Sequence, residues 1–149
     1  MANVDDVAAA VLARTGTIDT YKLQKLVYYS QAWHLVWEDR PLFQARIEAW
    51  ANGPVVPKLY QRHRGNYRMS NWRWGDADRL TDAERGTVAA VIDFYGDKPG
   101  HELSELTHRE APWRDARNSA GLLPGERGTV EITLASMLEY YGGLVGNDL

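Results

Sequence analysis

The chain has 149 residues, no cysteine and a net charge of −3 at pH 7. Its length suits one domain with its own core, and the absence of cysteine excludes disulfide scaffolds, thiol catalysis and cysteine-bound zinc. The charge balance and the short apolar runs fit neither a nucleic-acid polycation nor a membrane-spanning protein, and the first residues lack the pattern of a signal peptide, so we expect a cytoplasmic domain over residues 1–149.

Two helices are predicted in the first part of the chain. Asn3 caps a helix that runs through Arg14, and Gly16 ends it. A second helix begins at Asp19 or Thr20 and extends to about residue 38.

A narrow polar stripe runs along this second helix. Gln24, Gln31 and Glu38 recur at regular intervals as a narrow stripe, whereas apolar side chains cover most of the remaining circumference. A helix that is apolar over so much of its surface is normally packed on several sides. We therefore expect it to lie at the centre of the fold.

A short antiparallel sheet is predicted next. Residues 46–50 alternate polar and apolar side chains, which is typical of a strand, and residues 69–74 are a candidate partner. Asn52, Gly53 and Pro54 predict a turn, and Pro57 lies in the first turn of a following helix.

The rest of the chain is predicted to be helical. Thr81 and Glu84 form a capping box that begins a helix ending at Gly96. Residues 102–109 predict another helix, Pro112 begins a short one, and Thr133 caps the last. The predicted fold class is mainly α, a single compact helical domain with a small antiparallel β element.

Ser30 and His34 lie one helical turn apart and could form half of a hydrolase site, with His34 as the general base. However, no nucleophile turn surrounds the serine, and no glycines suited to an oxyanion hole follow it. We interpret His34 as a buried polar residue whose ring bonds a backbone carbonyl or a carboxylate, and we expect no catalytic residue.

His101, Glu105 and His108 could share one face of a helix, as zinc ligands would. In the reliable two-histidine motif, the histidines lie on adjacent helical turns, whereas His101 and His108 are two turns apart. No nucleotide-binding loop occurs in the sequence either. We therefore expect neither a metal nor another cofactor.

The segment 58–74 combines cations with aromatic rings and contains no acidic residue. This composition is found in single-stranded nucleic-acid platforms, in surfaces that meet an acidic protein, and in solvated faces whose rings enter the core. The acidic charge of the whole chain disfavours nucleic acid. A nucleic-acid-binding module that uses residues 58–74 is nevertheless the alternative function.

Several short blocks follow one another in a distinctive order along the chain. They occupy residues 22–26, 28–29, 33–34, 41–43, 47–50, 53–56, 59–60, 106–108 and 112–113. Together they resemble the Panacea-domain family, also described as SocA-like antitoxins and phage-associated proteins. The motif residues that would support the fold or the interface are Trp33, His34, Trp50, Gly53, Pro54, Thr107, His108, Pro112 and Trp113.

The resemblance implies the antitoxin of a type II toxin–antitoxin system. Such a protein is not an enzyme and neutralises a co-encoded toxin by direct protein–protein binding. Some members also look like adaptors that deliver the toxin to a bacterial AAA+ protease. Because the domain pairs with unrelated toxins, the resemblance does not identify the toxin.

An interface of this kind gains most of its binding energy from a few large aromatic and arginine side chains. The segment 58–74 offers such side chains in a stretch with a weak core pattern. We expect the partner to contact Tyr60, Arg62, Arg64, Tyr67, Trp72 and Trp74.

Overall fold

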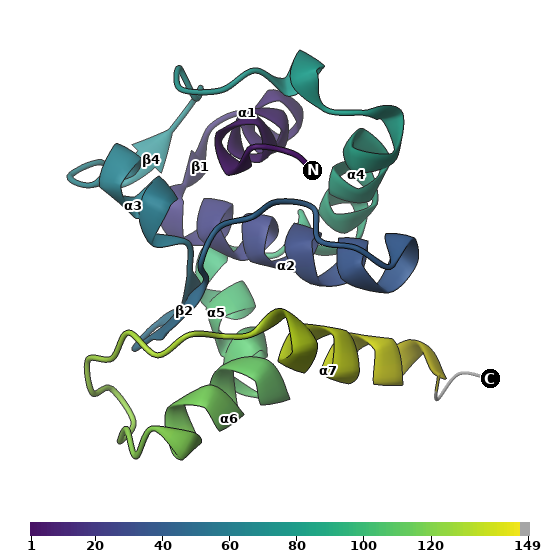
Figure 1. The fold of residues 1–149 in the computed structure, drawn as a ribbon. Helices are drawn as coiled ribbons and strands as arrows, with labels where there is room; N and C mark the ends of the chain where they lie inside the picture. The colour runs from purple at the N-terminus through teal and green to yellow at the C-terminus, as the bar shows by residue number, and fades with distance from the viewer. Residues whose placement is uncertain (147–149) are drawn as a thin grey trace.

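One long helix, α2 (Thr20–Glu38), runs through the middle of the fold, as Figure 1 shows for the computed structural model, which describes residues 1–146. Helices α1 and α4 cover one side of α2, and α5 and α7 cover the other. Helix α6 packs against α5 and α7. The bounds of these helices are Val4–Thr15 (α1), Asp82–Tyr95 (α4), Gly100–His108 (α5), Ala111–Ser119 (α6) and Leu134–Gly146 (α7).

Side-chain caps fix where the helices begin. The Asn3 side chain accepts a hydrogen bond from the backbone at the start of α1, and the Asp19 side chain does the same for α2. Thr81 and Glu84 form both bonds of the predicted capping box at α4. These bonds satisfy backbone N–H groups that have no partner within the helix. The predicted starts of the three helices are confirmed.

The glutamines of α2 connect it to extended backbone instead of facing solvent. Gln31 is fully buried; its Oε1 accepts from the Leu42 amide at 2.7 Å, and its Nε2 donates to the Phe43 carbonyl at 2.8 Å. Gln24 bonds both backbone groups of Val56 in the same way. The predicted central position of the helix is confirmed, and two members of its polar stripe replace the hydrogen bonds that a neighbouring strand would supply.

The strand pairing differs from the predicted one. Strand β2 (Glu48–Trp50) pairs with β3 (Gly53–Val55), which follows directly, and not with residues 69–74. Strand β4 (Arg68–Met69) pairs instead with β1 (Ile18–Asp19). Pro54 indicated a turn, but it lies in β3, whose only strand neighbour in the described residues is β2, and a residue without an N–H is tolerated on such an outer edge.

A cluster of tyrosines joins α2 to the C-terminal helices. The hydroxyls of Tyr29 and Tyr141 both donate to Glu110 Oε1, at 2.7 and 2.8 Å, and the Tyr28 hydroxyl lies 3.1 Å from that of Tyr141. Burial raises the pKa of the Glu110 carboxyl, although the two tyrosine hydrogen bonds oppose this shift. Buried polar groups here bond to one another, so the core contains a closed network.

Seven helices and two small antiparallel sheets confirm the predicted fold class for residues 1–146. The short helix α3 (Pro57–His63) begins with the predicted proline and follows the β2–β3 hairpin. A 3-10 turn, η1 (Ala77–Arg79), leads into α4. Within the described residues, we find no helix with both the length and the apolar character needed to cross a bilayer.

Candidate functional site

A groove of about 750 Å³ opens between the first turns of α2, the β2–β3 hairpin, α3 and a loop from late in the chain. Segments far apart in the sequence form its walls, and Figure 1 shows the loop before α7 running past β2. The principal lining side chains are Tyr21, Lys25, Trp50, Tyr60, Arg64, Tyr67 and Arg127. A concave site of this size is the default position for a binding function.

The floor of the groove is built around Lys25. This side chain is only 1% exposed although it lines the groove. Gly53 lies against it, because a Cβ on Gly53 would approach Lys25 Cε to 2.6 Å and the Thr107 hydroxyl to 3.2 Å. Gly53 also has φ +128°, a backbone conformation that residues other than glycine rarely adopt. A glycine at this position leaves room for the lysine.

The groove is cationic. Lys25, Arg64 and Arg127 are among its lining residues, and no Asp or Glu occurs among the described residues that line it. Burial lowers the pKa of the Lys25 ammonium to about 8, although Asp19 opposes this shift. The pKa of His63, also at the groove, is lowered by burial as well. At pH 7 an ammonium with a pKa of about 8 is still mostly protonated, so Lys25, Arg64 and Arg127 offer complementary charge to an anionic group.

A second hollow of about 500 Å³ adjoins the groove and shares Tyr21, Asn52 and Tyr67 with it. The rings of Tyr21 and Tyr67 meet edge to face at 6.4 Å. His101, Glu105 and His108 all line this second hollow. Nevertheless, no group of three potential ligands in residues 1–146 is placed to hold a metal ion.

The six predicted contact residues fall into two groups. Tyr60, Arg64 and Tyr67 line the groove, and Tyr67 is 65% exposed. The other three gather around Asp5 at the start of α1. They are Arg62, Trp72 and Trp74.

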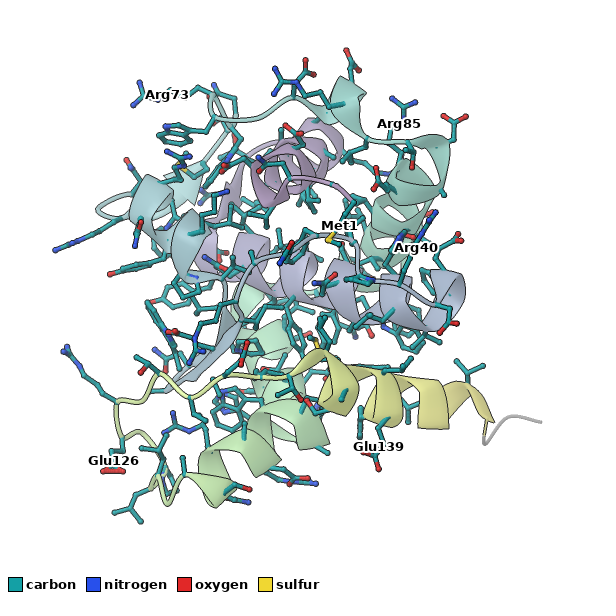
Figure 2. All side chains as sticks on the ribbon, in the orientation of Figure 1. Met1, Arg40, Arg73, Arg85, Glu126 and Glu139 are labelled. Atoms are coloured by element: carbon teal, nitrogen blue, oxygen red, sulfur yellow. The ribbon has the colours of Figure 1, made fainter. Side chains whose placement is uncertain are left out.

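This second group makes internal contacts. Arg62 Nη2 lies 3.2 Å from the Asp5 carboxylate, and Trp72 Nε1 donates to the same carboxylate at 3.0 Å. Trp72 is 4% exposed, and the Trp74 ring packs on it at 5.0 Å between centroids. The Trp74 ring also lies beneath the guanidinium of Arg73, which Figure 2 labels at the edge of the molecule. Trp72 therefore has a structural role, whether or not a partner touches its neighbours.

Most of the motif residues converge beside the groove floor. The Trp113 indole donates to the Trp50 carbonyl at 2.8 Å, and the His108 ring stacks on Trp113 at 3.9 Å. His108 Nε2 is buried without a hydrogen-bond partner, and burial lowers the pKa of this ring. Thr107 lies against the Gly53 position. The buried prolines of this group are Pro54 in β3 and Pro112 in the first turn of α6.

Two motif residues lie elsewhere, at the contact between α2 and α4. Trp33 Nε1 donates to the Tyr95 hydroxyl at 2.9 Å, and His34 Nδ1 lies 2.8 Å from the Thr87 hydroxyl. The expected carbonyl or carboxylate partner of His34 is wrong, because a threonine on α4 reaches the ring instead. Ser30 is buried and donates to the Leu26 carbonyl. Each member of this Ser–His pair therefore bonds another group.

Tyr21, Lys25 and Arg127 belong to the groove, but the sequence did not point to them as contacts. The signal for Lys25 was present: it is a charged residue next to Leu26 and Val27 on a helix predicted to be packed on several sides. Arg127 had no such signal, because it lies in an irregular loop far along the chain. Only the tertiary structure brings these residues together.

The fold and the groove define a helical domain with a cationic groove. The family model of the SocA-like antitoxin, Panacea domain, matches residues 23–114. This match covers more than half of the chain, so the protein belongs to that family, and the resemblance seen in the sequence is confirmed. Comparison with curated proteins and with solved structures gave no match.

Proposed function

We propose that this protein is a cytoplasmic type II antitoxin that binds a co-encoded toxin through the groove and neutralises it by covering its active surface. Membership of the SocA-like antitoxin family supports the class of function. The observation that supports the location is the convergence of motif residues from the β2–β3 hairpin and α5 at the groove floor. The proposal covers residues 1–149 as one antitoxin domain.

Three side chains from the predicted contact set are well placed to meet a partner. Tyr60, Arg64 and Tyr67 are all exposed and line the same cavity. Tyrosine and arginine are enriched among residues that dominate binding energy, and truncation of such a residue costs about 2 kcal/mol or more. Arg62, Trp72 and Trp74 remain candidate contacts, but their truncation would also disturb the packing around Asp5.

Co-expression tests this proposal directly. The product of the neighbouring open reading frame is induced with and without this protein, and growth and complex formation are measured. Rescue by the wild type, together with loss of rescue in the Tyr60→Ala and Tyr67→Ala variants, is the expected result. A harmless neighbouring product, or rescue without a complex, would refute neutralisation by contact.

Two further experiments test whether the protein also acts as a protease adaptor and whether it instead binds nucleic acid. If the protein also acts as an adaptor, the toxin should be degraded by a bacterial AAA+ protease only when this protein is present. If it is instead a nucleic-acid-binding module, its affinity for a single-stranded oligonucleotide should fall steeply with salt, because bound phosphates release counterions.

A further inference from the structure

Lys25 is an unusual residue to find at the base of a groove. Its side chain is 1% exposed and belongs to a helix whose neighbouring positions are buried. Among the ion pairs of residues 1–146, none includes Lys25. A buried ammonium without a close anion costs free energy, so a lysine retained in such a place is a candidate for function.

The backbone around Lys25 leaves space for the ammonium but does not place an anion against it. Gly53 leaves the space in which Lys25 Cε and Nζ lie, at 2.6 and 3.3 Å from the position that a Cβ would occupy. Lys25 Nζ lies over the ring of Tyr21, 5.9 Å from its centroid. The charged and titratable groups that face Lys25 from the surrounding elements are Asp19, Tyr21, His63 and His108.

The groove above Lys25 combines rings with further cations. Trp50 and Tyr60 meet edge to face at 4.9 Å, and Arg64 and Arg127 are both exposed lining residues. An acidic peptide segment fits these features, because its apolar atoms would contact the rings while its carboxylate reached the ammonium. A nucleic acid fits less well, because its phosphates need cations along an exposed track and the whole chain carries a charge of −3.

We propose that the groove is an acidic-peptide site, in which Lys25 at the floor binds a side-chain or terminal carboxylate of the toxin. This inference rests on the proposed function and names the chemistry of the partner segment. In the complex, the carboxylate supplies the counterion that Lys25 lacks. The charged form of Lys25 is therefore more stable in the complex than it is in the free protein.

Calorimetry of toxin binding in buffers of different ionisation enthalpy provides the first test. Because the pKa of Lys25 is about 8 before binding and rises when the carboxylate arrives, proton uptake is expected near pH 8 to 9. Affinity should fall as the pH increases through this interval. The pKa values of His63 and His108 are lowered by burial, so both rings are neutral there and do not contribute.

The variant Lys25→Met keeps the length of the side chain and removes its charge. We expect toxin affinity to fall roughly thirtyfold or more and the proton uptake to disappear. Arg85→Met is the matched control, because Arg85 is an exposed cation on α4 and is absent from both hollows. Its affinity and proton uptake should equal those of the wild type.

These measurements distinguish failure of the proposed function from failure of the Lys25 inference alone. If the wild type does not bind the toxin, the proposed function fails and this inference fails with it. If the wild type binds, but Lys25→Met binds equally well or the wild type takes up no proton, the inference alone is refuted. If Lys25→Met does not fold, the ¹³Cε resonance of wild-type Lys25 gives its pKa directly, and an unchanged pKa in the complex refutes the carboxylate contact.

A double-mutant cycle identifies the carboxylate. Each Asp or Glu of the toxin is replaced by its amide, and binding to the wild type and to Lys25→Met is compared. One toxin residue should show strong coupling to Lys25, whereas independent effects at every acidic position would contradict the pairing. Tight binding of a single-stranded oligonucleotide that depends on Lys25 would overturn the choice of partner.

Discussion

Replacement of Gln31 by leucine should destabilise the fold far more than an ordinary polar-to-apolar change. Gln31 is the fully buried amide that bonds the backbone between α2 and β2. Gln31→Leu has a similar volume but leaves the Leu42 N–H and the Phe43 carbonyl without partners, and both residues are fully buried. Each unsatisfied group costs about 1–3 kcal/mol.

The expected loss in the free energy of unfolding is therefore roughly 2 to 6 kcal/mol, from a total of about 5–15 kcal/mol for a domain. A longer hydrogen bond of 3.3 Å from the Phe43 amide adds little to this sum. Urea denaturation followed by tryptophan fluorescence measures the difference.

Gln61→Leu is the matched control, because Gln61 is an exposed residue on α3. This variant should stay within about 0.5 kcal/mol of the wild type. If the Gln31→Leu protein unfolds at the same urea concentration as the control, the Gln31 amide does not stabilise the backbone at Leu42 and Phe43. That result would refute the prediction.

Three further predictions concern other buried contacts. Because the pKa of Glu110 is raised, the folded wild type keeps a proton that the unfolded state has released, so the wild type loses stability as the pH rises above about 4.3. The Glu110→Gln variant lacks this titration, and its stability relative to the wild type should therefore increase by at most about 1.4 kcal/mol per pH unit. Urea titrations at several pH values measure both free energies of unfolding, and a constant difference between the two proteins would contradict the prediction. Gly53→Ala should lose about 1–3 kcal/mol of the free energy of unfolding and weaken toxin binding, because φ is +128° and the new Cβ meets Lys25. Gly143→Ala is the control: Gly143 has open space around it on α7, so this variant should keep or raise the melting temperature. Arg117→Met should lower the melting temperature by several degrees, because the buried guanidinium donates to three backbone carbonyls; an unchanged value would show that these bonds contribute nothing.

The helix starts were predictable because their signals are local. The caps at Asn3, Asp19 and Thr81 depend on residues only two or three positions away. A capping residue and its backbone partner are thus both visible in one short window of sequence. The proline at the start of α3 is a local signal of the same kind.

The hairpin and the groove were less predictable because they depend on tertiary contacts. Pro54 argued against a strand, and only the free edge of a two-stranded hairpin removes that objection. Arg62 and Trp72 resembled surface contacts, since nothing in their segment indicates that Asp5 will accept their hydrogen bonds. Asp5 itself resembled an ordinary acidic residue in the first turn of a helix.

The loop that contributes residues 127–129 to the groove lies outside the part of the chain that the family model matches. Arg117 bonds the carbonyls of Leu123 and Glu126, and Arg46 bonds that of Thr129, so the loop is fastened on both sides without using its own side chains. The side chains of Arg127 and Thr129 make none of these bonds and can be exchanged, whereas a Cβ on Gly128 would clash with Leu122 Cδ1. A protein engineer who wished to alter what this groove binds would begin with these two positions of the loop.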